Sequence, residues 1–480
     1  MISSSQKTKV AYGDFQTPLG LAEKVCQRLI KLDVCPDIVV EPTCGVGNFI
    51  NAASSSFCSA SRIIGIEINQ QYIHQIQENK QLLQDQRIDL QQADFFRFDW
   101  SSWINQLKGN ILVLGNFPWV TNAQQGSIGG ENLPLKSNFQ NHNGLDAITG
   151  KSNFDISEWM LIQTILWLQG RDSTLAMLCK TSVSRKILSY LHSRQLSLAD
   201  CATYKIDAKK HFDADVEACL LYCRFDSTSR NYYCNVFDSL ESTTYYRIGY
   251  RNHRLVRDID AFEKLRRFYA PESGTKWRSG IKHDCSKVME FREFGDTFVN
   301  GLGEAIDLED AYLFPLLKGS DIAQDRIATT DKSVLVTQKF VGESTEPIRS
   351  LAPKTWKYLE SHSEQLASRK SKIYHNHPKF SIFGVGAYTF APWKIAICGL
   401  YKKLEFKLIG SIQNKPVVFD DTVYFLSFED KETALRTLEI LTSSPVLDFY
   451  SSLIFWDEKR PIKSSILSSL NLTTLLESVK

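Results

Sequence analysis

The chain lacks several features that define large classes of protein. No stretch of its 480 residues approaches 18 uninterrupted apolar positions, and the start MISSSQKTKV has no apolar segment of the signal-peptide kind. Its 11 cysteines include no CxxC pair, which disfavours a zinc site or a disulfide framework and indicates reduced, mostly buried thiols. We therefore expect a cytoplasmic protein with no membrane association and no metal.

The chain also has little net charge, because 56 basic residues nearly balance 54 acidic ones to give +2. The charge is unevenly distributed, however. Residues 351–410 hold ten Lys or Arg against three acidic residues, and residues 251–282 hold nine against four. A phosphate backbone responds to local potential, so these clusters favour a nucleic-acid partner, although two solvated faces would have the same composition.

The length of the chain and its hydrophobic pattern predict two domains. Up to residue 228, short apolar runs alternate with amphipathic stretches, which is typical of a doubly wound α/β sheet. The expected strands are 37–42, 62–68, 111–116, 174–180 and 218–225, and the clearest helices are 21–32 and 154–170. Residues 229–480 change to mixed short strands and helices, which predicts a second domain of α+β type.

A glycine turn, EPTCGVGNF, follows the first expected strand and precedes a helix, where a nucleotide-like ligand can approach the backbone. Gly45 and Gly47 match a dinucleotide fingerprint, but Ile50 stands where the third glycine is required, which disfavours a nicotinamide cofactor. Glu41 and Pro42 open the turn. An acidic residue there suits a ligand with a cationic centre, such as the sulfonium of S-adenosylmethionine.

Two further carboxylates end the next strands. Glu67 lies about 20 residues beyond the glycine turn, the distance at which an acidic residue binds the hydroxyls of a ribose. Asp94 follows the third strand and could accept a hydrogen bond from an adenine amino group. Each residue alone could be a solvated strand end or a turn residue. Together they favour an adenosine ligand.

Five segments in order carry a family resemblance: FQTP (15–18), EPTCGVGNF (41–49), GIEIN (65–69), QADFF (92–96) and GNFPW (115–119). The series resembles the gamma-class DNA amino-methyltransferases, which methylate adenine N6 with S-adenosylmethionine. The resemblance implies a Rossmann-like class I methyltransferase domain at 1–228 and a target-recognition domain at 229–480. It assigns cofactor contacts to Phe15, Thr17, Pro18, Glu41, Pro42, Gly45, Gly47, Phe49, Glu67, Ile68, Asp94, Phe95 and Asn116.

The last segment would be the catalytic turn. An exocyclic amino group is a poor nucleophile until two acceptors localise its lone pair. The side chain of Asn116 and the backbone carbonyl of Phe117 can supply them, while Pro118 fixes the turn and Trp119 offers a face for a flipped-out base. The family's usual form is Asn-Pro-Pro followed by an aromatic residue, and here Phe117 replaces the first proline.

The resemblance also implies double-stranded DNA as substrate, a monomer on that DNA, and a cognate restriction endonuclease encoded separately. Basic residues proposed for phosphate contacts are Lys136 and Lys151, in the loop 120–152 that would close over DNA, and Lys394, Lys402 and Lys403. Candidates of lower rank are Phe154 and Asp155 for the cofactor pocket, Lys180 for phosphate, and Phe212 for the base pocket.

Two alternatives stay open at this point. The same two-acceptor turn could serve an RNA adenine or a protein glutamine, although a glutamine methyltransferase needs far less chain than the second half provides. The chain could also be a catalytically weak DNA-binding or specificity protein that keeps the turn as a base pocket.

Overall fold

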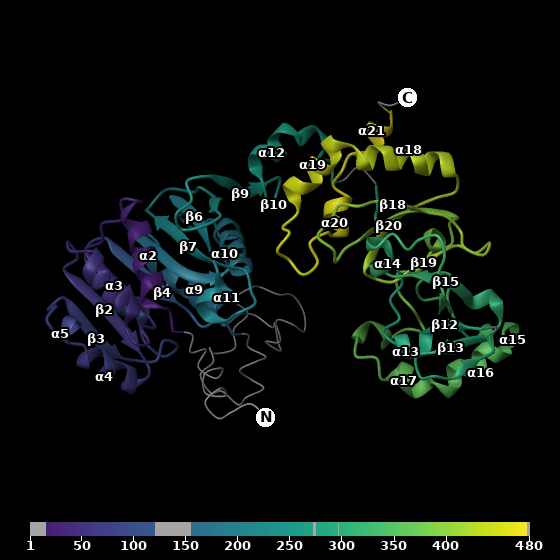
Figure 1. The fold of residues 1–480 in the computed structure, drawn as a ribbon, viewed down its shortest axis with the longest axis horizontal. Helices are drawn as coiled ribbons and strands as arrows, with labels where there is room; N and C mark the ends of the chain where they lie inside the picture. The colour runs from purple at the N-terminus through teal and green to yellow at the C-terminus, as the bar shows by residue number, and fades with distance from the viewer. Residues whose placement is uncertain (1–15, 121–154, 272–274, 296, 478–480) are drawn as a thin grey trace. The chain divides into compact units, whose positions relative to one another are not determined.

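The computed structural model describes residues 16–120, 155–271, 275–295 and 297–477. It divides into two compact units, Met1–Asp260 and Ala261–Lys480 (Figure 1). Phe15, Phe154, Lys136, Lys151 and nearly all of the loop that contains the last two lie outside the described residues.

The first unit is built on a sheet of order β3-β2-β1-β4-β5-β7-β6-β8-β9-β10 (Figure 1). Strands β3, β2, β1, β4 and β5 are mutually parallel, whereas β7 runs antiparallel to β5 and β6. The strands are β1 Ile38–Glu41, β2 Arg62–Glu67, β3 Ile88–Gln92, β4 Ile111–Asn116, β5 Ser173–Lys180, β6 Asp200–Ile206, β7 Ala218–Phe225, β8 Tyr233–Phe237, β9 Tyr245–Arg251 and β10 Arg254–Val256. All five strands expected from apolar runs are present.

Helices cover both faces of this sheet, as the continuous apolar runs require. Alternate residues of β4 point to opposite faces, so Leu112 and Leu114 join a core cluster with α2 and α3, while Ile111 and Val113 are buried outside that cluster. On the other face α9 packs against α6 and α10. The helices are α2 Leu19–Ile30, α3 Asn48–Ser56, α4 Gln70–Glu78, α5 Lys80–Leu83, α6 Trp100–Ile104, α9 Ile156–Leu168, α10 Thr181–Ser193 and α11 Ala208–Phe212.

The division between the units falls after Asp260 and not after residue 228. The helix–strand rhythm does end near residue 228, because β8, β9 and β10 follow one another without intervening helices. These strands nevertheless extend the first sheet, since β8 pairs with β6 in the register Ala202↔Asn235. Hydrogen bonding to a distant strand, which local periodicity does not encode, sets the boundary.

The second unit has two sheets, β11-β20-β17-β18 and β14-β13-β12-β16-β15-β19. Its strands are β11 Arg278–Ser279, β12 Glu290–Phe294, β13 Thr297–Asn300, β14 Ala305–Ile306, β15 Leu313–Leu317, β16 Lys332–Leu335, β17 Trp393–Cys398, β18 Lys407–Ile409, β19 Val418–Phe419 and β20 Val423–Phe428. Its longer helices are α12 Ile259–Lys264, α14 Gly319–Ala323, α16 Pro353–Ser361, α17 Ser363–Ala367, α18 Lys431–Thr442, α19 Ser444–Leu453 and α21 Leu472–Glu477, with one-turn helices α13 Ser286–Met289, α15 Ile348–Leu351 and α20 Ser464–Leu467. The expected α+β mixture is therefore observed.

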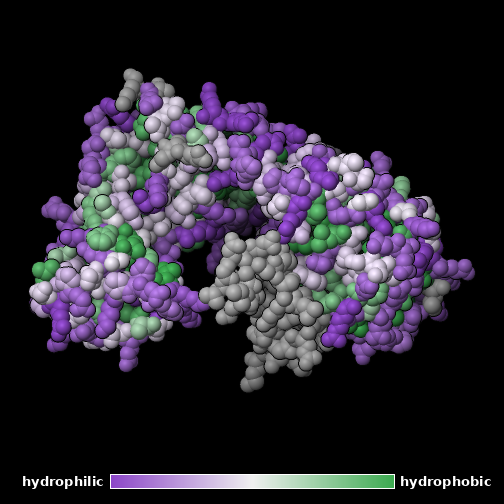
Figure 2. Space-filling model, turned by 180° about the vertical axis from the view of Figure 1, so that it is seen from behind, coloured by the Kyte–Doolittle hydropathy of each residue, from purple (hydrophilic) through white to green (hydrophobic). Residues whose placement is uncertain are grey.

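The surface seen in Figure 2 is mostly hydrophilic, with hydrophobic groups scattered in small patches. Within the described ranges, every helix is too short or too polar to cross a bilayer.

Candidate functional site

A cavity of about 520 Å³ opens at the carboxyl ends of β1, β2, β3 and β4. This is the edge at which open parallel sheets bind ligands, and the volume lies within the range of about 300–1,000 Å³ typical of small-molecule sites. Eleven of the residues predicted from the sequence line it: Thr17, Glu41, Pro42, Gly45, Phe49, Glu67, Ile68, Asp94, Phe95, Asn116 and Pro118.

The glycine turn forms one wall of the cavity and depends on its glycines. Gly45 and Gly47 have φ of +53° and +82°, a conformation that other residues rarely adopt. A Cβ on Gly47 would lie 2.8 Å from the Ile76 side chain. The Glu67 carboxylate fastens the turn to β2, because it accepts the backbone N–H of Gly45 at 2.8 Å and that of Asn69 at 2.9 Å.

Two carboxyl groups of this cavity lie deep in the protein. Glu41 is 3% exposed and Glu67 is 9% exposed. Burial, together with the neighbouring charge of Glu67, holds the pKa of the Glu41 carboxyl well above its usual value. A positive charge bound beside Glu41 would favour the ionised form of its carboxyl.

The turn after β4 meets the cavity through Asn116 and Pro118. The Asn116 amide donates from Nδ2 to the Thr17 hydroxyl at 3.3 Å, and Asn48 Nδ2 donates to the Thr17 carbonyl at 2.7 Å. The Thr43 hydroxyl donates to the Asn116 carbonyl at 3.5 Å. Thr17 thus contacts the asparagine amide and is itself held by Asn48, while Thr43 holds the backbone of Asn116.

Aromatic packing holds the two aromatic residues of the turn. Phe117 is buried and packs edge-on against Phe95, with ring centroids 5.3 Å apart, so its side chain anchors a turn that lacks the family's first proline. Trp119 is 7% exposed, packs edge-on against Phe212 at 5.0 Å and donates from Nε1 to the Leu178 carbonyl at 3.4 Å. Its proposed stacking on a base requires one of these rings to move, and it stays a prediction.

A lysine side chain donates a hydrogen bond to the same turn. Lys180 Nζ donates to the Trp119 carbonyl at 3.0 Å and to the Asp155 carboxylate at 2.6 Å. Asp155 also caps α9 by accepting the backbone N–H of Ser157, and Ile156 N–H donates to the Val120 carbonyl at 2.9 Å. Lys180, expected at a phosphate, is instead engaged inside the fold, where it ties the turn to the ends of β5 and α9.

No protein-family model matches the chain. It is 62% identical over 479 residues, covering all of both chains, to the type II methyltransferase M.NspV of Nostoc sp. (strain ATCC 29411 / PCC 7524). The chain belongs to the type II methyltransferases. Its fold also matches that of the type IIL restriction-modification enzyme MmeI, solved in complex with DNA, with a TM-score of 0.54, 13% identity, and coverage of 97% of this chain and 67% of that one.

The predicted class I methyltransferase fold and the cofactor S-adenosylmethionine are thereby confirmed. The cavity of this methyltransferase fits that cofactor. It has room for a small molecule, and the carboxyls of Glu41 and Glu67 in its lining suit a ligand that carries sulfonium and ammonium cations.

Some residues of the methyltransferase lie elsewhere than the sequence suggested, or were missed. Pro18 and Gly47 precede α2 and α3 and shape the wall without lining the cavity, and Phe117 and Trp119 pack behind it. Lining residues that sequence reasoning missed include Gln16, Thr43, Cys44, Asn48, Asn69, Tyr72, Phe96, Ile156 and Met160. Asn48 could have been predicted most easily of these residues, because it directly follows the second glycine of the turn.

The prediction for Lys394 is wrong. Its side chain is 2% exposed in β17, where Nζ donates to the Ala391 carbonyl at 2.7 Å. Burial lowers the pKa of Lys394 to about 7. A phosphate cannot reach this amine without unfolding the strand. Lys402 and Lys403 are exposed in the turn between β17 and β18, as phosphate contacts must be, and they stay predictions.

Proposed function

We propose that this methyltransferase transfers the methyl group of S-adenosylmethionine to N6 of a flipped-out adenine in double-stranded DNA. The observation that carries the proposal is the position of Asn116. It ends β4 beside a cavity that contains two buried carboxyls, and the Phe117 carbonyl comes next in the chain. This is the arrangement that a planar amino substrate needs.

In the proposed reaction the Asn116 side-chain oxygen and the Phe117 carbonyl accept the two N–H bonds of the adenine amino group. The nitrogen lone pair is then drawn out of the ring and can attack. S-adenosylmethionine supplies the electrophilic methyl group when bound, and the amino nitrogen exchanges one proton for it. Thr17 holds the Asn116 amide so that its oxygen stays available, and Trp119 stacks on the flipped base.

Two relatives support DNA as the substrate. M.NspV is named as a type II methyltransferase, and MmeI is a restriction-modification enzyme that was solved with DNA. The second unit serves as the target-recognition domain, and the enzyme acts as a monomer within a restriction-modification system whose endonuclease is encoded separately. Three hypotheses compete with this proposal: an RNA adenine as substrate, a protein glutamine as substrate, and a catalytically weak DNA-binding protein.

The test is to express the chain in cells without adenine methylation and to sequence their DNA with modified-base detection. We expect N6-methyladenine at one short sequence, and none in cells that express Asn116→Ala to the same level. Methylated cytosine, unmodified DNA, or an Asn116→Ala variant that modifies as fully as the parent would each contradict the proposal.

A further inference from the structure

We propose that a basic cavity within the second unit binds the phosphate backbone of double-stranded DNA. The inference rests on the proposed function and goes beyond it by naming the residues. The cavity has a volume of about 450 Å³. Lys276, Arg278, Lys282 and Arg460 line it, and Asp421 is the single carboxylate among its lining residues.

Three of these cations come from one extended segment, which belongs to the basic cluster 251–282. Side chains of an extended chain alternate between its faces. Trp277 and Ile281 are buried at 4% and 2% exposure, whereas Lys276 is exposed and Arg278 and Lys282 are partly exposed, and all three cations line the cavity. Of the four alternate positions 276, 278, 280 and 282, three are therefore basic and the fourth is Gly280.

The backbone of this segment is held in place. Arg278 pairs with Phe425 of β20, and Lys282 exchanges two backbone hydrogen bonds with Phe383 at 2.8 and 2.9 Å. Gly280 passes so close to the next segment that a Cβ there would lie 2.1 Å from the Asp420 carbonyl. The cations are thus presented from a rigid wall, so little ordering entropy is lost when they bind.

Aromatic rings support both arginines. The Arg278 guanidinium lies 4.5 Å from the centroid of the Tyr388 ring, and that of Arg460 lies 5.1 Å from Tyr424. Stacking of this kind orients the planar group. Arg460 also donates to the Asp421 backbone carbonyl, whereas the edge N–H groups of Arg278 can donate to a phosphate.

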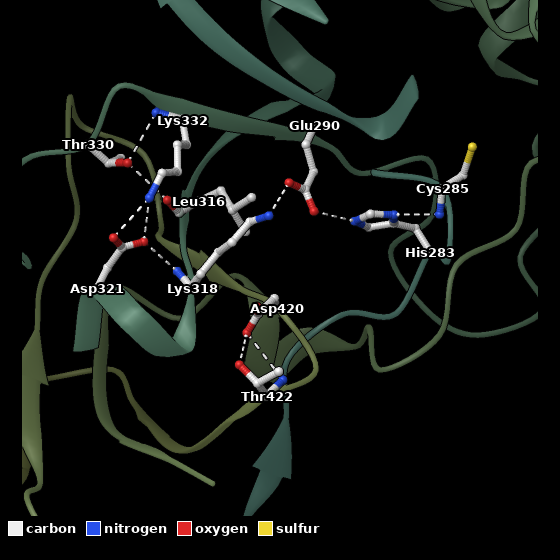
Figure 3. A network of polar contacts seen from close by, with 10 residues as sticks. All are labelled: His283, Cys285, Glu290, Leu316, Lys318, Asp321, Thr330, Lys332, Asp420 and Thr422. Carbon is white, nitrogen blue, oxygen red and sulfur yellow. Dashed lines mark hydrogen bonds and ion pairs between the residues drawn. The ribbon is translucent and has the colours of Figure 1, made fainter. Parts of the chain in front are cut away.

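Two other lysines in this unit, Lys318 and Lys332, are paired with carboxylates. Figure 3 shows Lys318 paired with Glu290, which also contacts His283, and Lys332 bound to Asp321 at 2.8 Å. Of the four cations that line the cavity, Lys282 lies 3.6 Å from the Asp284 carboxylate and Arg460 lies 3.9 Å from that of Asp421, whereas Lys276 and Arg278 have no ion pair among the described residues. Uncompensated charge in a rigid cavity is the electrostatic mark of an anion site, and point charges with stacked guanidinium groups suit a phosphate backbone.

The test compares the full chain with the double variant Lys276→Ala/Arg278→Ala and with the control Arg349→Ala, an exposed arginine outside the cavity. DNA affinity is measured across a salt series, on a fragment that contains the methylated sequence and on one that lacks it. Each lost phosphate contact reduces the slope of log K against log salt by about 0.9. Between 50 and 200 mM salt the parent should therefore lose about 12-fold more affinity than the double variant.

We expect the loss to be equal on both fragments and absent from Arg349→Ala. An unchanged slope in a parent that methylates DNA overturns this inference alone. A loss confined to the fragment with the methylated sequence also overturns it, because the cavity would then read bases. A parent that neither binds nor methylates DNA overturns the proposed function as well. If the double variant unfolds at a lower temperature than the parent, Lys276→Ala, an exposed position, replaces it, with a slope change of about 0.9.

Discussion

Cofactor binding should release a proton from Glu41. The carboxyl is buried beside Glu67, which holds its pKa well above the usual value in the free protein. A cation about 4 Å away attracts a carboxylate by about 4 kcal/mol at an effective dielectric constant of 20. That attraction lowers the pKa of the Glu41 carboxyl and favours its ionised form.

The affinity for S-adenosylmethionine should consequently rise by up to tenfold per pH unit between the pKa of Glu41 in the complex and its raised pKa in the free protein. The measurement is calorimetry in buffers with different ionisation enthalpies, which counts the released protons. Glu41→Gln is the control and should release none. Comparison with S-adenosylhomocysteine, which lacks the sulfonium charge, shows how much of the release the sulfonium causes. Absence of proton release by the parent near neutral pH would refute the reasoning, as would release by Glu41→Gln equal to that of the parent.

The same shift affects stability with a defined sign. Because the folded pKa of Glu41 is raised, the folded state binds more protons than the unfolded state between the two pKa values. Glu41 thus stabilises the folded state below its unfolded pKa, and this stabilisation is lost as pH rises through its folded pKa. Thermal unfolding of the cofactor-free protein should show this loss, and Glu41→Gln should remove it.

The remaining predictions concern the turn after β4 and the lysines Lys180 and Lys394. Asn116→Ala should lower turnover by at least about 100-fold with cofactor binding intact, because a preorganised polar group is lost. Thr17→Val should lower turnover less. Turnover by Asn116→Ala equal to that of the parent in single-turnover assays would contradict the assignment. Lys180→Met should cost about 3 kcal/mol of unfolding free energy in denaturant titrations, because it leaves Asp155 buried without its cation, and Lys180→Arg should recover part of that loss. The pKa of Lys394 is lowered to about 7, so above that pH the folded state binds fewer protons than the unfolded state. The free energy of unfolding should therefore rise from about pH 7 toward the ordinary lysine pKa. Lys394→Met should abolish this rise and leave DNA affinity unchanged.

Local sequence predicted the catalytic half of the fold because its signals are local. The runs at β1, β2, β4, β5 and β7 are buried on both faces, so they are continuously apolar and bounded by turn residues. Parallel strands place their carboxyl ends at one edge, and for that reason Glu41, Glu67, Asp94 and Asn116 could be assigned to one site from their positions after strands.

The sequence by itself determined the order of motifs and the cofactor, because each depends on a few adjacent residues. Only the tertiary structure decided which charges are available. Lys394 and Lys402 are both lysines of one basic cluster, yet one is buried in a strand and the other is exposed. The partners of Lys180, the strands that move the unit boundary to Asp260 and the cations gathered at Arg278 are equally invisible to local pattern. Burial and pairing are set by residues that are distant in sequence, and these contacts form only when the chain folds.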